Sequence, residues 1–198
     1  MAIPTSPTTA QLEAVNELLM SVGQAPVTQL EASNPDVALA FDTLTQVSRE
    51  VQAQGWTFNR EFRLTVNPDS TTKEFIIPDD FIQIDLSDNA ANAGHDAVRR
   101  RDLGDTSTTK SKLYDRTKHT FKWQQEKLQV DIVRYFEWGD LPRPVRDFVV
   151  ARAAAIFSSR IVGDPTQYQL LRERELFARN QAMEYETQQG DYSFFGRP

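Results

Sequence analysis

Hydrophobic residues near the start of the chain recur at three- and four-residue steps, the spacing of one face of an α-helix. The first series falls between residues 12 and 22, and Gly23 can end this helix by adopting the left-handed conformation. Asn34-Pro35-Asp36 has the form of a helix start, with a capping side chain before a first-turn proline. A second helix is therefore predicted up to Gly55, with a buried stripe of Val37, Phe41, Leu44, Val47 and Val51.

The last third of the chain shows the same helical spacing. Pro142 and Pro144 suit the first turn of a helix, where the missing N–H of proline costs little. Gly163 can end that helix, and Asp164-Pro165 can cap and start another that extends to Gly190. The predicted buried stripe of this last helix comprises Tyr168, Leu171, Glu175, Ala178, Ala182 and Tyr185.

The middle of the chain changes to the two-residue period of β-strands. Phe62, Leu64 and Val66 alternate with polar residues, and residues 87–97 form a polar, small-residue stretch that predicts a loop. We expect an antiparallel sheet or open barrel here. Its predicted strands cover residues 62–66, 74–77, 81–86 and 129–136, together with a hairpin whose arms are 113–116 and 120–123.

Two helices bury too little surface to form a stable domain alone, so the N- and C-terminal pairs should pack together. The expected fold class is α+β, with a helical bundle that is interrupted by a small antiparallel β insertion. The predicted helical domain comprises residues 1–56 and 139–190, and the insertion comprises 57–138. A C-terminal tail follows at 191–198.

Composition and charge narrow the possible functions. The 198 residues include no cysteine, which excludes a disulfide scaffold, a zinc–cysteine finger, an iron–sulfur site and a cysteine nucleophile. Neither a signal peptide nor a membrane-spanning stretch is predicted. The net charge of −6 is unevenly placed, because residues 98–127 carry nine basic and four acidic residues. That segment has a net charge of +5 and the remainder −11, which suggests two surfaces with different partners.

The basic residues of the middle segment are candidates for binding. They could grip phosphates, or they could dock on an acidic protein surface. A short basic run alone is weak evidence for sequence-specific DNA binding, so we favour protein docking. The candidate docking patch comprises Arg99, Arg100, Arg101, Lys110 and Lys112.

Few residues suggest catalysis. Asp79 and Asp80 are adjacent carboxylates that could hold a metal or act as acid and base, but after a proline they are more typical of a solvated turn. His119 falls in a predicted turn, and the chain has no glycine-rich phosphate loop. We expect no catalytic residue, no metal and no cofactor, although sites assembled from distant residues stay open.

The C-terminal tail carries three aromatic residues among small and polar ones. Tyr192, Phe194 and Phe195 are too few to build a core, and aromatic residues at a polar terminus are costly unless they dock somewhere. The tail is therefore a candidate anchor, either on its own bundle or in a partner.

Several short motifs, in order along the chain, resemble the tail tubular protein A family, the adaptor or gatekeeper proteins of short-tailed bacteriophages (podoviruses). The resemblance extends nearly from end to end, but residues 87–112 follow no pattern of the family. The matching segments are Leu12–Leu19, Ser21-Val22-Gly23 with Pro26-Val27, Val51-Gln52, Gly55–Asn59, Tyr114–Thr117 and Met183–Glu186.

The resemblance implies a structural role in the virion tail, with no enzymatic activity, for a protein made in the cytoplasm of the host bacterium. It implies a ring, dodecameric in this family, that is mounted under the portal and carries the nozzle, tail tubular protein B. Tail fibres attach near that junction in relatives, and genomic DNA passes through the lumen without sequence-specific binding. No membrane is involved. The alternatives are a tail-associated glycan hydrolase and a head-completion protein of another phage type.

Overall fold

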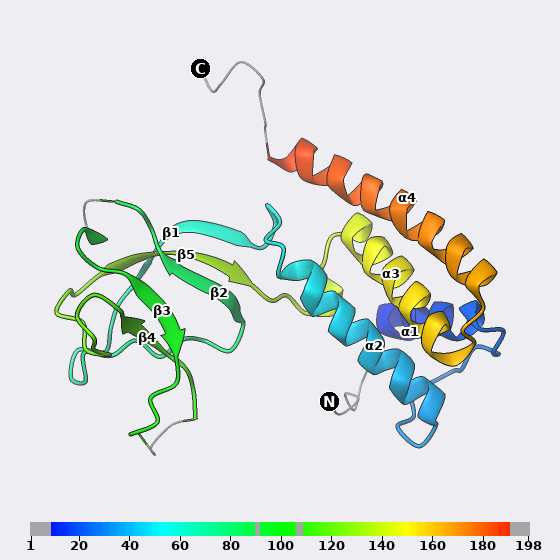
Figure 1. Cartoon of the computed structure of the whole chain (residues 1–198), viewed down its shortest axis with the longest axis horizontal. Coiled ribbons are helices and arrows are strands. Elements are labelled where there is room, and N and C mark those ends of the chain that lie inside the picture. The colour runs from blue at the N-terminus through cyan, green and yellow to red at the C-terminus, as the bar shows by residue number, and fades with distance from the viewer. Residues whose placement is uncertain (1–8, 90–91, 106–108, 191–198) are drawn as a thin grey trace. The chain divides into compact units, whose positions relative to one another are not determined.

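The computed structural model describes residues 9–89, 92–105 and 109–190 (Figure 1). Four α-helices and two small antiparallel sheets make up this part of the chain, which confirms the predicted α+β class. The residues cluster into two compact units. The helices belong to one unit, and residues Gly55–Tyr135 form the other, the β unit.

The helical unit is organised around its third helix. The helices are α1 (Thr9–Ser21), α2 (Pro35–Gln52), α3 (Arg143–Ile161) and α4 (Pro165–Gln189), and α3 contacts each of the other three. A short 3-10 turn, η2 (Trp138–Asp140), precedes α3. Ten residues of α3 are buried, and four of them are alanines whose small side chains let neighbouring helices approach closely.

Local chemistry sets the helix ends, as the sequence predicts. The side chain of Asn34 accepts hydrogen bonds from the backbone N–H groups of Asp36 (3.1 Å) and Val37 (3.4 Å). Asp164 caps α4 in the same way by accepting from the N–H of Thr166 at 2.8 Å. Gly23 has a φ of +78°, which only glycine adopts without strain, and it lies two residues after the end of α1.

Helix α4 is long but buries little of its surface. Of its 25 residues, only Glu175, Ala178 and Ala182 are buried, and all three belong to the predicted stripe. The carboxylate of Glu175 is held by Arg172 at 2.5 Å and by Arg152 of α3 at 3.6 Å. The charge of this buried side chain is therefore compensated, while most of the remaining helix surface stays exposed.

The β unit contains a three-stranded and a two-stranded sheet, both antiparallel. The larger has the order β1-β5-β2, with β1 at Arg60–Val66, β5 at Leu128–Arg134 and β2 at Phe81–Leu86. The smaller pairs β3 (Ala97–Arg100) with β4 (Lys112–Asp115). Side chains from both sheets and from the loops share one core, which includes Val66, Ile77, Phe81, Leu113, Trp123, Leu128, Val130 and Ile132.

A β-bulge in β1 alters the face on which its residues lie. The pairing register with β5 shifts between Glu61 and Leu64, and Arg63 has a φ of +54° at this point. Phe62, which the alternating pattern groups with Leu64 and Val66, is 66% exposed. The simple alternation is therefore wrong at Phe62, because a bulge moves residues on its two sides to different faces.

The predicted hairpin is also wrong in its partner. Strand β4 pairs with β3, while residues 120–123 contribute only the single bridge between Asp115 and Thr120. Residues 74–77 likewise form only one bridge, between Ile76 and Lys112, instead of a full strand. The short, arginine-rich β3 has little of the apolar alternation that identifies strands from sequence, so its pairing with β4 was not predicted.

Candidate protein-docking surfaces

The triple-arginine run does not form a single surface, because two of its members belong to a strand. Successive side chains of a strand point to opposite faces, so Arg99 and Arg100 of β3 diverge. Arg99 donates hydrogen bonds to the backbone carbonyls of Pro78 and Ile82, each at 3.4 Å. Arg100 lies over the ring of Tyr114, 4.8 Å from its centroid. Arg101 follows the strand and is exposed.

The two lysines of the predicted patch lie in different environments. Lys110 pairs with Asp79 at 3.0 Å, and both side chains are at least half exposed. Lys112 is 1% exposed, and its ammonium donates to Asp105 at 2.6 Å and to Glu74 at 2.7 Å. These two hydrogen bonds raise the pKa of Lys112 above its ordinary value despite burial. Because Lys112 is interior, we leave it out of any proposed docking surface.

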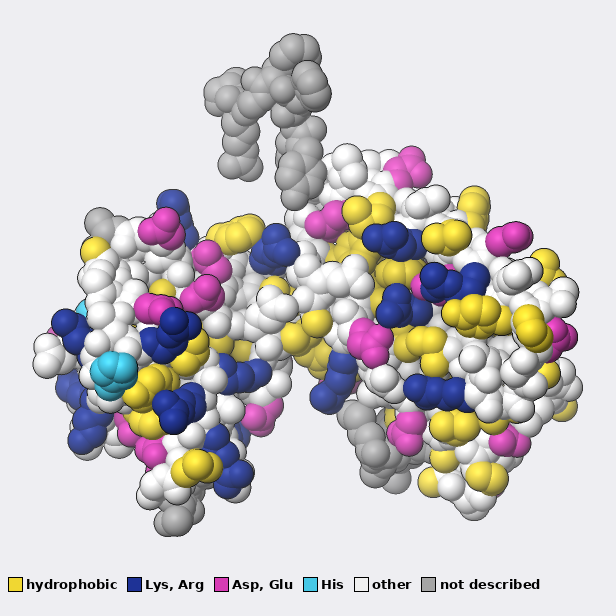
Figure 2. All heavy atoms as spheres, in the orientation of Figure 1, with side chains coloured by type: hydrophobic (Ala, Val, Ile, Leu, Met, Phe, Trp, Pro, Cys, Tyr) yellow, Lys and Arg dark blue, Asp and Glu magenta, His cyan; other side chains and the backbone are white. Residues whose placement is uncertain are grey.

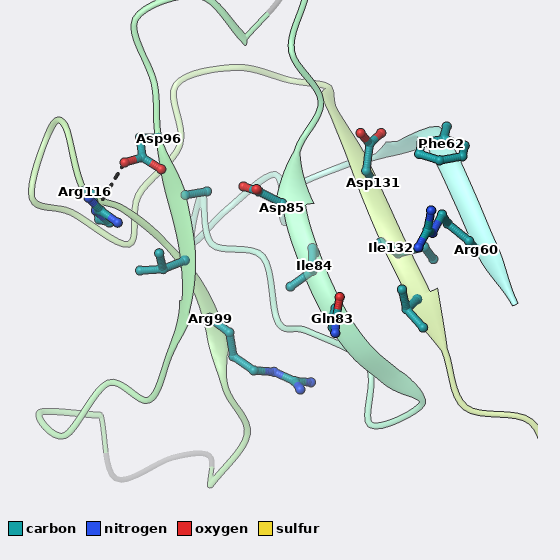
Figure 3. Close-up of a pocket in the computed structure, with 13 residues that line it drawn as sticks. Arg60, Phe62, Gln83, Ile84, Asp85, Asp96, Arg99, Arg116, Asp131 and Ile132 are labelled. Atoms are coloured by element: carbon teal, nitrogen blue, oxygen red, sulfur yellow. Dashed lines mark ion pairs between the residues drawn. The ribbon is translucent and has the colours of Figure 1, made fainter. Parts of the chain in front are cut away.

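An open groove of about 470 Å³ lies on the β unit (Figure 3). Its walls come from β1, β2, β5 and β3, and they combine three arginines with three aspartates around an apolar floor. Arg116 and Asp96 form an ion pair across 3.2 Å, drawn as a dashed line in the figure. The charged lining residues are Arg60, Arg99, Arg116, Asp85, Asp96 and Asp131. A groove lined by both arginines and aspartates suits an extended peptide that itself carries basic and acidic residues.

Two carboxylates of the groove face each other across neighbouring strands. Asp85 of β2 and Asp131 of β5 are directly opposite in register, an arrangement that is unfavourable for like charges. One oxygen of Asp131 accepts hydrogen bonds from the backbone N–H of Arg63, at 2.8 Å, and from the hydroxyl of Ser87. Asp131 therefore stabilises the bulge of β1 through one of its two carboxylate oxygens.

Asp79 and Asp80 do not act together. Asp80 pairs with Arg134 at 2.8 Å, whereas Asp79 pairs with Lys110. Within the described residues, no three Asp, Glu, His or Cys side chains gather in a way that could hold a metal ion. Asp79 and Asp80 therefore form two separate ion pairs, which stabilise the turn between Ile77 and β2.

The β unit also contains a histidine–aspartate pair that the sequence does not predict. His95 Nδ1 contacts Asp115 Oδ2, and its Nε2 contacts the side chain of Gln125. Burial alone would raise the pKa of Asp115, but hydrogen bonds from His95 and from the backbone N–H groups of Lys118 and Thr117 lower it. Both ring nitrogens of His95 contact other side chains, so the pair has a structural role that connects three loops or strands of the β unit. No local spacing links residues 20 positions apart, so no sequence signal pointed to it.

Apolar side chains also gather on the surface of the helical unit. Figure 2 shows hydrophobic side chains interspersed with Lys and Arg over the face of this unit that is in view. On α4, Leu170, Leu176, Phe177 and Met183 are each 45% exposed or more. Their positions outside the predicted stripe were a signal available in the sequence. The three aromatic residues of the tail, Tyr192, Phe194 and Phe195, lie outside the described residues.

Comparison with known proteins identifies the family. The model of the tail tubular protein family matches residues 12–192, a range that includes most of α1 and, within the described residues, all of the later helices and strands. No curated protein matched the chain significantly. None of the helices in the described part of the chain combines the length and apolar character needed to cross a membrane. The chain therefore belongs to the tail tubular protein family, and it is a structural protein of a bacteriophage tail.

Proposed function

We propose that this tail protein is the adaptor that joins the portal at the capsid vertex to the tail nozzle. In this proposal, copies of the chain form a ring, dodecameric as the family resemblance implies, and genomic DNA passes through its lumen. The observation that carries the proposal is the family match over residues 12–192, which spans both the helical and the β unit. Two compact units with different surfaces can contact different neighbours.

The distribution of charge supports a ring with head-to-tail contacts. Such contacts are heterologous, so one face of each subunit must meet a different face of the next. The segment 98–127, which belongs to the β unit, has a net charge of +5, whereas the rest of the chain has −11. We propose that Arg100 and Arg101, together with Lys110, dock on an acidic axial neighbour, whereas Arg99 lies on the other face of β3. An acidic lumen would let DNA slide, because few cations would hold its phosphates.

The position of the chain in an intact particle tests the proposal directly. A cryo-electron microscopy reconstruction should place a ring of this chain between portal and nozzle, with its acidic surface toward the lumen. A chain located elsewhere would overturn the adaptor assignment. A ring with no nozzle protein below it would favour the head-completion alternative. Arginines 99–101 lining the narrowest part of the channel would refute the acidic lumen alone.

Binding measurements test the basic patch separately. Arg100→Ala combined with Arg101→Ala should weaken binding to the portal or to the nozzle, with a loss that grows smaller as salt rises. Lys122→Ala combined with Lys127→Ala removes two exposed charges of the same segment outside the patch and serves as the matched control. Equal binding by the double variant and the control would contradict the docking role of these arginines.

A glycan hydrolase is the second candidate, because Asp85 and Asp131 line one groove on neighbouring strands. Glycosidases use two carboxylates that flank the scissile bond. The test is release of reducing ends from purified host envelope glycans, with Asp85→Asn as the inactivating variant and Asp79→Asn as the control. Activity that Asp85→Asn abolishes and Asp79→Asn retains would establish the enzyme; no activity would leave the adaptor role.

A further inference from the structure

The outer surface of α4 exposes more apolar area than packing within the helical unit explains. Leu170 and Phe177 lie seven residues apart on one flank and are 64% and 65% exposed. Leu176 and Met183 form a similar pair on the opposite flank. Large apolar side chains repeated at a helical period mark a contact surface when no part of the same unit covers them.

One of these flanks borders a groove with an apolar floor. The groove has a volume of about 260 Å³ and lies among α1, α3 and α4. Val150, Ala151 and Ala178 are nearly fully buried beneath it, and Phe177 forms a wall. The charges at its rim are paired within the unit, Arg174 with Glu17 at 2.8 Å and Arg143 with Asp147 at 2.8 Å. An occupant therefore needs apolar groups more than a net charge.

The groove continues in both directions along the helices. Toward the end of α4, a second hollow is lined by Asp147 and Gln181, which also line the first, and by Tyr185 and Gln188. In the other direction, a small hollow contains Trp138 and Arg146. The indole Nε1 of Trp138 and the Nε of Arg146 are buried and have no hydrogen-bond partner among the described residues. Asp147 lines all three hollows, so they form one continuous groove.

We propose that this groove receives the aromatic tail of a second copy of the chain, with Phe194 and Phe195 on the apolar floor beside Phe177. The inference rests on the ring of the proposed function and names a contact that joins neighbouring subunits. The tail and the groove that receives it are different parts of one chain, which is what a heterologous interface requires.

Chain length argues against the tail of the same copy. Phe177 lies 13 residues before Gly190, so it is about 20 Å from the end of the helix at a rise of 1.5 Å per residue. Phe195, the farther of the two phenylalanines, stands five residues after Gly190 and reaches at most about 18 Å in a fully extended chain. To reach the groove of its own copy, the chain would also have to reverse direction after α4, and this turn would use part of that length. The tail of another subunit is under no such restriction.

The absence of cysteine allows a cross-linking test without background. Phe177→Cys and Phe194→Cys are made in separate proteins, which are co-assembled on purified portal and treated with a short bismaleimide. The matched control replaces Phe177→Cys with Leu176→Cys, an exposed position on the opposite flank of α4. We expect a covalent dimer from Phe177→Cys with Phe194→Cys at a yield at least about tenfold above the control, because a docked tail has a high effective concentration.

The double variant with both cysteines in one chain separates the possible occupants. A ladder of cross-linked copies on a denaturing gel supports the exchange of tails between subunits. A cross-linked monomer would show that each tail occupies its own groove, and an absence of cross-links in a formed ring would show that the tail binds elsewhere, for example on the portal. Either result overturns the inference. Light scattering of the same samples reports whether rings form, and failure to form rings on the portal would overturn the proposed function as well.

Discussion

Replacing Lys112 with methionine should destabilise the β unit far more than the same change at Lys110, two residues earlier in the same basic segment. Removing one partner of a buried ion pair costs about 3–5 kcal/mol, because the remaining charge is left unpaired. Glu74 and Asp105 retain 18% and 23% of their side-chain exposure, so water compensates partly and we expect about 3 kcal/mol. Lys110 and Asp79 are 50% and 79% exposed, and such pairs contribute about 0–1 kcal/mol.

Urea unfolding followed by tryptophan fluorescence measures the difference. Trp56 and Trp123 both lie in the β unit and are nearly fully buried, and the indole of Trp123 donates to the carbonyl of Leu113 at 3.0 Å. With a denaturant dependence of about 1–3 kcal/mol per molar, a loss of about 3 kcal/mol lowers the midpoint by roughly 1–3 M. A midpoint for Lys112→Met equal to that of Lys110→Met would refute the assignment of a buried charge cluster.

Neutralising the acids should rescue the Lys112 variant. Adding Glu74→Gln and Asp105→Asn to Lys112→Met removes the two carboxylates nearest the ammonium and leaves Asp102, which is 3.8 Å from it, so much of the lost stability should return. The unmodified protein should also respond to alkali. The folded-state pKa of Lys112 is raised above 10.5, so its contribution is complete below pH 10.5 and is lost as the pH rises through the raised value. Lys112→Met should lack this part of the alkaline loss.

Three further changes test other contacts of the two units. Asp115→Asn should reduce stability near neutral pH and make stability depend less on pH in acid. The lowered pKa of Asp115 contributes stability above pH 3.8, and this contribution disappears as the pH falls through the folded-state pKa. Unfolding of both proteins measured across the acid range tests this expectation. Gln52→Leu should cost about 1–3 kcal/mol in thermal unfolding, since it removes the hydrogen bonds of the Gln52 side chain with the N–H and the carbonyl of Phe136. Gly55→Ala should cost at least about 1 kcal/mol by urea unfolding, because Gly55 has a φ of +73° and a Cβ there would meet a guanidinium nitrogen at 2.6 Å.

The helices could be predicted because their signals are local. The caps at Asn34 and Asp164 and the buried positions of α4 each depend on residues within one or two helical turns. The β unit depends on contacts between distant residues. The bulge that exposes Phe62 is stabilised by Asp131, which is 69 positions after Phe62 in the chain. No residue near Phe62 indicates that this contact forms.

The candidate patch shows the same division between local and distant information. Lys110 and Lys112 differ little as sequence signals, since both are basic residues of one segment. Their environments differ because β4 turns Lys112 toward a cluster that includes Glu74, which is 38 positions earlier in the chain. Charge counting identifies a basic segment but cannot tell an interior lysine from a surface one, because that depends on the pairing of strands.

The two proposed interfaces, the basic patch and the groove beside Phe177, should therefore respond differently to salt. Of the basic segment, Lys110, Lys112 and Arg116 already have acidic partners within the β unit, so its net charge of +5 overstates the field available to a partner. What remains acts at a distance and is screened, so docking through the patch should weaken steadily as salt rises. The groove beside Phe177 has an apolar floor and a rim of paired charges, so tail binding there should change little with salt. If contacts within the ring persist at high salt while attachment to an axial neighbour is lost, the tail forms the contacts within the ring and the arginines bind the axial neighbour. If attachment to the axial neighbour persists while the ring contacts are lost, the two assignments are reversed.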